Sequence, residues 1–322
     1  MRLQGKGKIA VIGCGRVGMT ILRSLILRSV GNRYILIDKL ENQSIIEAEI
    51  SDLEDVMVPF HPYLDIFFGT YSDLDSVDII IIAAGAAQKR GQSRTALLTQ
   101  NFQVIKSIIQ KINTTNFSGS ILLVTNPCDV LAYCVAKISS LPPSKILATG
   151  TLLDSHRYRI ELAKELRINN LNLIDAFVLG EHGRSSVIIK SASTIKHLPL
   201  KYLLKKGEYL TLEQFGSIEQ TVIEKAKMII NQKGWTDQGI GAAATVLVRK
   251  LLCPEDSFSI ASVLLQGEYG MKNVFLGVPV ILGQGEIKEI IEWELDEEEQ
   301  RALEISAARI KDLISGIEDL TV

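Results

Sequence analysis

The first half of the chain alternates short apolar runs with longer stretches of helical periodicity, and no other feature restricts the fold as strongly. The apolar runs predict strands at residues 8–12, 34–38, 64–68, 77–84, 120–125 and 145–148. Several of these runs are apolar throughout, which is typical of strands buried on both faces of a parallel sheet. Helical stretches such as 17–28 and 94–112 separate them. The alternation predicts an α/β fold built on a doubly wound parallel sheet with right-handed crossovers.

The second half of the chain has a different pattern and predicts a second domain. Helical stretches at 155–166, 217–231, 238–252 and 296–317 surround β-rich segments at 174–179, 187–191, 257–266 and 273–282. This mixture predicts an α+β domain over residues 149–322, after a first domain over 1–148. Because no Pro-, Gly- or Ser-rich linker joins the two parts, we expect them to pack closely.

Composition excludes several classes of partner. The formal net charge of −2 leaves no basic surface for nucleic acid or for an anionic membrane. The longest apolar run, residues 79–87, is far shorter than the roughly 20 residues of a membrane helix. The N-terminus is polar, so no signal peptide is expected, and the four cysteines show neither a CxxC pair nor a repeated spacing. We therefore expect a cytoplasmic protein with reduced thiols and no bound metal.

A glycine-rich turn follows the first predicted strand and opens the first predicted helix. Its sequence is Gly13-Cys14-Gly15-Arg16-Val17-Gly18, and Asp38 ends the second predicted strand. Glycines allow a tight turn in which backbone N–H groups approach a pyrophosphate, and a carboxylate at Asp38 suits the ribose hydroxyls of NAD. Strand, turn, helix and acid together predict a Rossmann-type NAD site. The alternative is a βα turn that binds nothing.

His182 is the best candidate for acid–base chemistry among the four histidines. It lies in Leu179-Gly180-Glu181-His182-Gly183, just after a predicted strand, and the flanking glycines leave its ring open to a ligand. An imidazole transfers protons reversibly near neutral pH, as the interconversion of a carbonyl and an alcohol requires. Asp154 is the candidate that would orient the ring, although an aspartate at a helix start is also an ordinary N-cap.

Two basic features point to an anionic substrate. Arg157 lies three residues after Asp154, on nearly the same helical face, and can bind a carboxylate through two hydrogen bonds. The segment 85–94 is basic and bounded by glycines, which suits a closing lid, although such a segment is also typical of an ordinary solvated loop.

These motifs together resemble those of the L-lactate/malate dehydrogenase family. The resemblance covers the 13–18 turn, Asp38, the 84–94 loop and the segments 124–127, 150–159, 180–183 and 233–240, all in the family's order. It implies NAD as cofactor, held by Gly13, Gly15, Val17, Gly18, Asp38, Asn126 and Ile240. It also implies a homotetramer or homodimer acting on a small 2-oxo or 2-hydroxy monocarboxylic acid.

The resemblance implies a role for each catalytic candidate. His182 is the proton donor and acceptor, and Asp154 orients it. Arg157 binds the substrate carboxylate, and Arg94 polarises the carbonyl after loop closure. Asn126 is expected to contact the substrate oxygen or the nicotinamide ribose, and Thr236 to line the substrate side chain.

Gln88 is the position that separates lactate from malate enzymes of the family. Malate enzymes place an arginine there to pair the second carboxylate of oxaloacetate. A neutral glutamine leaves that carboxylate unpaired, at a cost of several kcal/mol. The sequence therefore predicts an L-lactate dehydrogenase that reduces pyruvate.

Three positions depart from the family's pattern. Arg184 stands where an acid is usual, and branched-chain 2-hydroxy acid (hydroxyisocaproate-type) enzymes also lack that acid and resemble this chain at 150–154. Arg90 replaces a common proline in the lid, so some dicarboxylate activity stays open. Arg159 matches an arginine that binds fructose bisphosphate, but Asp175 replaces the accompanying histidine, so we expect no activation by that ligand. The alternatives are therefore a branched-chain enzyme, then a malate dehydrogenase, then a non-catalytic NAD-binding module.

Overall fold

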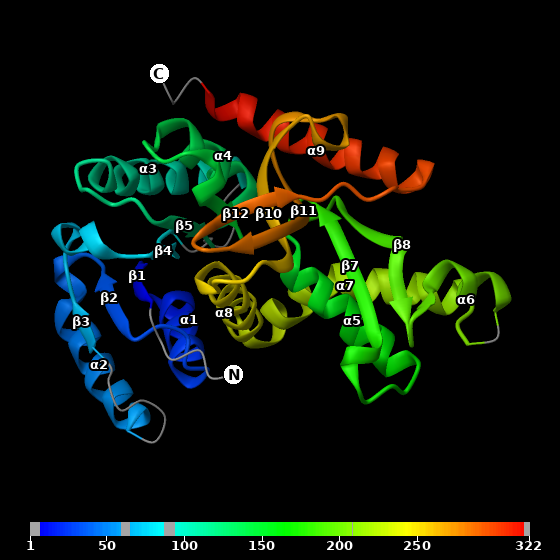
Figure 1. Cartoon of the computed structure of the whole chain (residues 1–322), viewed down its shortest axis with the longest axis horizontal. Helices are drawn as coiled ribbons and strands as arrows, with labels where there is room; N and C mark the ends of the chain where they lie inside the picture. The colour runs from blue at the N-terminus through cyan, green and yellow to red at the C-terminus, as the bar shows by residue number, and fades with distance from the viewer. Residues whose placement is uncertain (1–6, 59–64, 87–93, 208, 319–322) are drawn as a thin grey trace.

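Six parallel strands form the sheet of the first domain. The computed structural model of the chain describes residues 7–58, 65–86, 94–207 and 209–318 (Figure 1). The strands are β1 (Lys8–Ile12), β2 (Arg33–Ile37), β3 (Asp65–Phe68), β4 (Ile79–Ile82), β5 (Ser120–Leu123) and β6 (Ile146–Ala148). They lie in the order β3-β2-β1-β4-β5-β6, each parallel to its neighbours. This confirms the predicted doubly wound sheet.

Four α-helices accompany these strands in the described part of the first domain. They are α1 (Arg16–Leu27), α2 (Gln43–Met57), α3 (Arg94–Ile112) and α4 (Cys128–Ile138). The strand order reverses at β1, which has β2 on one side and β4 on the other. In an open α/β sheet, ligands bind beyond the carboxyl ends of the strands at this reversal. The turn after β1 is therefore in the position expected of a binding site.

The second domain continues the same sheet with antiparallel strands. Its strands are β7 (Ile174–Gly180), β8 (Ser186–Ile195), β9 (Leu198–Pro199), β10 (Ser257–Gln266), β11 (Lys272–Gly283) and β12 (Glu286–Ile290). β10 pairs with β6 through Ser262 and Ala148, and β11 then joins β10 to β7. Its helices are α5 (Leu152–Glu165), α6 (Leu200–Lys206), α7 (Leu212–Lys233), α8 (Gln238–Leu252) and α9 (Glu297–Glu318). This mixed arrangement confirms the predicted α+β class.

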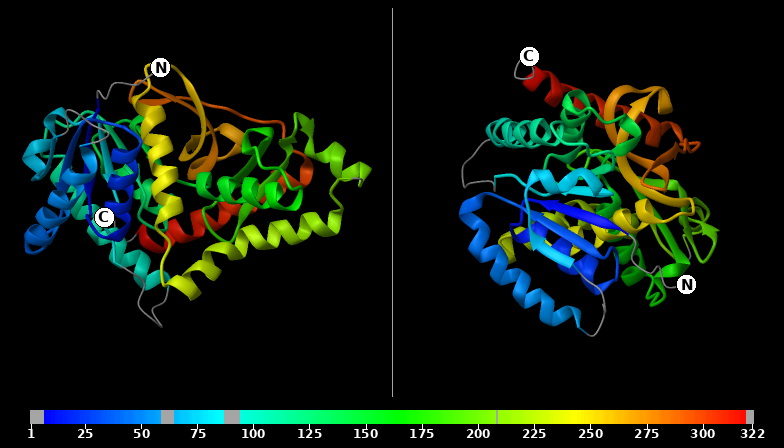
Figure 2. Two further views of the ribbon diagram at one scale, coloured as in Figure 1. Left: turned by 90° about the horizontal axis from the view of Figure 1, so that it is seen from below. Right: turned by 60° about the vertical axis from the view of Figure 1, so that its left-hand side comes forward.

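Helix α8 packs against α1 and so ties the second half of the chain to the first (Figure 2). The helices approach closely at Gly241, where an added Cβ would lie 2.9 Å from Thr20 Cγ2. Nearby, the Thr245 hydroxyl donates to Ser24 Oγ at 2.9 Å, so the contact combines a tight fit with a buried hydrogen bond. One hydrophobic core includes buried residues from both halves of the chain.

Most segments begin and end near the predicted residues. β8 extends to Ile195, beyond the predicted end at 191, and two other differences have local causes. Helix α7 begins at Leu212 rather than at 217, because Thr211 and Gln214 cap it reciprocally. β4 begins at Ile79 rather than at 77, since the Val77 N–H closes a preceding turn by donating to Leu74 O at 3.0 Å.

Candidate active site

The glycine turn after β1 has the shape of a phosphate cradle. Gly13 has φ +96°, and an added Cβ there would lie 2.3 Å from Ala84 N. A Cβ at Gly18 would lie 2.0 Å from the Gly13 carbonyl oxygen, so both positions require glycine. At Gly15 an added Cβ would meet no described atom within 4 Å. The turn is therefore closed on its inner side and open at the N-terminus of α1, where a pyrophosphate fits.

Asp38 follows β2 and lies beside this turn. Its Oδ2 accepts a hydrogen bond from the Cys14 N–H at 2.6 Å. Its Oδ1 accepts from Asn42 Nδ2 at 2.7 Å. These bonds fix the carboxylate next to the turn, in the place that suits ribose hydroxyls. Val17 is half-buried in the first turn of α1. The described residues of the turn thus fit a dinucleotide.

His182, Asp154 and Arg157 form one cluster at the junction of β7 and α5. His182 Nδ1 lies 2.6 Å from Asp154 Oδ2. Arg157 Nη1 donates to Asp154 Oδ1 at 2.9 Å, and both side chains are about nine-tenths buried. Thr151 is the N-cap of α5, and Asp154 turns its carboxylate to His182 instead. The Asp154 oxygens therefore hold the two groups that the sequence predicts beside it.

The charges of this cluster set its protonation state. The Asp154 carboxylate raises the pKa of His182 to about 9, against the opposing effect of burial. Burial opposes ionisation of Asp154, but His182 and Arg157 hold the pKa of that carboxyl below its usual value. At neutral pH the ring is thus an imidazolium that is ready to donate a proton.

A second carboxylate braces the loop that carries His182. Glu181 is buried, and its N–H donates to Ser306 Oγ of α9 at 2.7 Å. Its Oε2 accepts from the Ser185 N–H at 3.2 Å and pairs with Arg309 Nε at 3.4 Å. Sequence reasoning missed this bracing, since nothing near residue 182 indicates that α9 would reach it.

Asn101 of α3 is another residue that sequence reasoning missed. Its Oδ1 accepts from the Ala86 N–H at 2.7 Å, and its Nδ2 donates to the Asn126 carbonyl at 2.9 Å. It therefore connects the start of the predicted lid to the residue after β5. Asn126 precedes a cis bond to Pro127, and its side chain is exposed. The signal in the sequence is the spacing of Asn101 from Leu98 and Ile105, which places a polar residue on the apolar face of the helix, and in the fold its side chain is 2% exposed.

The segment before α8 meets the glycine turn. The Arg16 guanidinium lies 3.5 Å from the centre of the Trp235 ring, so residues adjoining Thr236 contact the predicted cofactor site. Thr236 and Ile240 are both half-buried. This contact brings the predicted substrate and cofactor residues into one region.

The predicted lid is described only at its ends. Gln88 and Arg90 lie outside the described residues. Arg94 opens α3, but its side chain is not among those described. Their roles therefore remain predictions.

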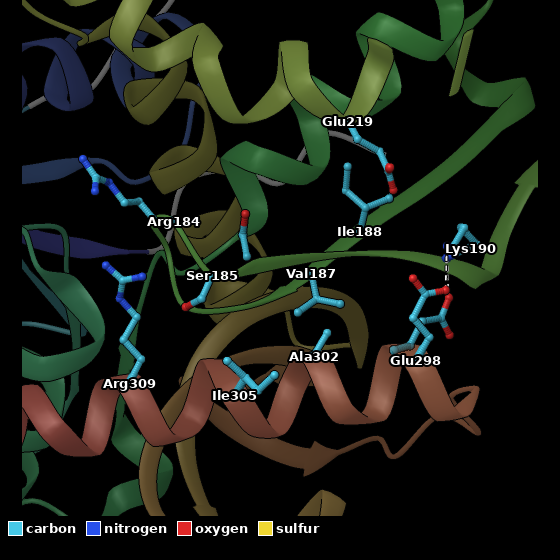
Figure 3. A pocket seen from close by; sticks show the side chains of 12 residues that line it. Arg184, Ser185, Val187, Ile188, Lys190, Glu219, Glu298, Ala302, Ile305 and Arg309 are labelled. Carbon is cyan, nitrogen blue, oxygen red and sulfur yellow. Dashed lines mark hydrogen bonds and ion pairs between the residues drawn. The ribbon is translucent and has the colours of Figure 1, made fainter. Parts of the chain in front are cut away.

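Arg184 faces a separate cavity of about 460 Å³ between β8, α7 and α9. Figure 3 shows Arg184 and Arg309 at one end of this cavity and Lys190 with Glu298 at the other. The cavity lining does not include His182, Asp154 or Arg157. The cation that departs from the family's pattern therefore borders a cavity that the cluster of His182, Asp154 and Arg157 does not line.

No described helix has the length and apolarity needed to cross a bilayer. Nor does any described group of histidine, cysteine, aspartate and glutamate side chains have the arrangement of a metal site. The four cysteines, all within the described residues, form no disulfide bond with one another.

Comparison with known proteins gives matches over nearly the whole chain. A family model for the lactate/malate dehydrogenase NAD-binding domain matches residues 7–148, and one for the α/β C-terminal domain of the same family matches 151–321. An L-lactate dehydrogenase of Lactococcus lactis is 36% identical over 310 residues, covering 96% of this chain and 98% of the relative. One of Mycoplasma genitalium is 35% identical over 308 residues, covering 95% and 97%. A minor L-lactate dehydrogenase of Enterococcus mundtii, solved with ligands bound, is similar at TM-score 0.93 and 31% identity, covering 97% of this chain and 99% of that one.

Proposed function

The chain belongs to the lactate/malate dehydrogenase family, and from this premise we propose that it interconverts pyruvate and L-lactate with NAD as cofactor. The observation that carries the proposal is the cluster in which Asp154 binds both His182 and Arg157. It joins a proton donor to a buried cation that suits a carboxylate, as a 2-oxo acid requires. The L-lactate dehydrogenases among the relatives support the same substrate class.

In this proposal His182 moves the proton. Its Nδ1 is engaged by Asp154, so Nε2 is the nitrogen that donates to the carbonyl oxygen of pyruvate. When bound, NADH supplies the hydride that reduces the neighbouring carbon. In the reverse direction neutral His182 accepts the hydroxyl proton of lactate, and Asp154 stabilises the imidazolium that forms.

Arg157 and Arg94 orient the substrate in this proposal. Arg157 donates to Asp154 through Nη1, and this is the one side-chain hydrogen bond described for its guanidinium. The other guanidinium N–H groups are therefore left to bind the substrate carboxylate. Arg94, delivered by the lid, stabilises negative charge on the carbonyl oxygen. Closing the lid also excludes water, which strengthens both interactions.

Gln88 selects a monocarboxylic acid in this proposal. Its amide carries no charge to compensate the second carboxylate of oxaloacetate, so that substrate loses its hydration without gaining an ion pair. Thr236 and Ile240 line the substrate and nicotinamide side of the same space.

A panel of 2-oxo acids tests the proposed substrate. Loss of NADH absorbance gives kcat/KM for pyruvate, 2-oxobutyrate, 2-oxoisocaproate and oxaloacetate. We expect pyruvate to exceed oxaloacetate by about a hundredfold or more, which corresponds to roughly 3 kcal/mol for the unpaired carboxylate. A preference for 2-oxoisocaproate would identify a branched-chain enzyme. Tight NADH binding without turnover of any of the four acids would identify a non-catalytic module.

We further propose that the protein is cytoplasmic and acts as a homotetramer or homodimer. The family resemblance supports this assembly, and gel filtration with light scattering tests it. A monomer at micromolar concentration would contradict it.

A further inference from the structure

Besides Asp154 and Glu181, a further buried carboxylate, that of Asp129, lies against the main chain of His182. Asp129 is only 2% exposed, and its Oδ2 accepts the His182 N–H at 2.8 Å. Its other oxygen, Oδ1, accepts no hydrogen bond from the described residues. The carboxylate therefore faces the main chain and the ring of His182 and, from β10, the Ser262 hydroxyl.

The position of Asp129 in α4 favours its charged form. It is in the first turn of that helix, where the helix dipole stabilises an anion. Burial acts in the opposite direction and raises the pKa of the carboxyl. The Ser262 hydroxyl of β10, the hydrogen bond from the His182 N–H and the nearby imidazolium charge counteract burial in part, and the pKa of the carboxyl stays above its usual value.

The groups that face this carboxylate and the ring form a nearly balanced set. Asp154 and Arg157 face His182 from α5, and Glu181, directly after β7, lies beside it with its charge paired to Arg309. Cys128 adjoins Asp129 on α4, and burial raises the pKa of its thiol well above the usual value, so it stays neutral. Two carboxylates, Asp129 and Asp154, thus face one guanidinium, that of Arg157. Protonated His182 makes this set neutral.

We propose that Asp129 is a positioning residue, which holds the His182 main chain in place and whose negative charge adds to that of Asp154 in favouring the imidazolium before substrate binds. Asp154 alone would be balanced by Arg157, and a proton on His182 would then add an uncompensated positive charge. With Asp129 ionised, the same proton neutralises the cluster. The inference rests on the proposed role of His182 in 2-oxo acid reduction.

Asp129→Asn separates the charge from the hydrogen bond, because its Oδ1 can still accept the His182 N–H. The pH dependence of kcat/KM for pyruvate reports the pKa of His182 in the free enzyme. We expect its falling limb to move to lower pH by about one unit, which is a tenfold change in the ring's proton affinity. Asp175→Asn, the same change on β7 where the residue pairs with Arg159, is the matched control and should leave the limb in place.

A second measurement does not depend on activity. NMR titration of the four histidine rings, with His182 assigned by the signal lost in His182→Gln, gives the pKa of His182 directly. We expect Asp129→Asn to lower it by about the same unit. Asp129→Ser is a second neutral variant, to be used where the asparagine side chain prevents folding.

The outcomes distinguish the inference from the proposed function. If the parent protein reduces pyruvate but neither neutral variant shifts the His182 titration by more than about 0.3 units, Asp129 acts only through packing and the inference is wrong. If the parent turns over no 2-oxo acid, the proposed function fails, and the NMR titration still decides whether Asp129 controls the ring.

Discussion

Replacing Asp154 by asparagine should remove most of the activity, because it removes the charge that raises the pKa of His182. The carboxylate lies 2.6 Å from His182 Nδ1 and raises the pKa of that ring to about 9. Without this charge the pKa should return toward its usual value of about 6.5. The difference is about 2.5 units, or roughly 3.4 kcal/mol of lost preference for the imidazolium.

The loss of activity then follows from two effects. At pH 7.5 a ring of pKa about 6.5 is protonated only about one-tenth of the time, so protonation alone lowers pyruvate reduction about tenfold. The asparagine amide can also present its N–H to Nδ1 and favour the wrong tautomer, which costs a further factor of about ten to a hundred. We expect kcat/KM for pyruvate to fall by about 10²–10³ at this pH.

The assay is kcat/KM for pyruvate from pH 5.5 to 9.5, followed by loss of NADH absorbance. In Asp154→Asn the falling limb of the pH profile should move from near pH 9 toward pH 6.5. Lowering the pH should then recover the roughly tenfold loss of activity that comes from deprotonation of His182. Glu165→Gln, which changes an exposed carboxylate on the same helix, is the control. NADH binding followed by fluorescence should be the same in all three proteins. A variant that keeps its limb near pH 9 would refute the assignment of the raised pKa to Asp154.

Three further substitutions or additions test individual contacts. Gln88→Arg should raise the ratio of oxaloacetate to pyruvate kcat/KM by about a hundredfold or more, because it pairs the second carboxylate; an unchanged ratio would assign specificity to another residue. Asp38→Ser should reduce the preference for NADH over NADPH by about tenfold, since a carboxylate repels the 2′-phosphate, and equal discrimination in both proteins would argue against that repulsion. Fructose bisphosphate at millimolar concentration should leave pyruvate turnover nearly unchanged, because Asp175 Oδ1 lies 3.7 Å from Arg159 Nη2 and repels phosphate; a gain of about tenfold or more would contradict this.

The elements that could be predicted from the sequence are those with local signals. Apolar runs without alternation indicated β1 to β6, because strands buried on both faces need no polar side chains. The helix at 238–252 was also predicted to the residue, since its apolar periodicity is strong and an aspartate precedes it. The glycines at 13 and 18 indicated the turn. The structure shows why glycine is needed there, since close contacts leave no room for a Cβ.

The residues that could not be predicted are those whose role depends on distant contacts. Asp129 looked like an ordinary acid in the first turn of a helix, and only the folded chain brings it to the His182 N–H. Asn101 is one polar residue in a long helix, and its bonds reach two other segments. Such roles depend on tertiary packing, which periodicity and spacing do not record.

The contact between α9 and the loop at residues 180–185 has a consequence for the order of events during synthesis. The first domain contains its own sheet strands and helices, so it can acquire the glycine turn while later segments are still being made. The hydrogen bond from the Glu181 N–H, however, cannot form until Ser306 has been synthesised, 125 positions further along the chain. The ion pair between Glu181 and Arg309 likewise forms only after Arg309, three residues beyond Ser306, has been synthesised. A ribosome-bound chain that has already folded its nucleotide-binding half would therefore lack a fixed proton donor until its final helix has emerged.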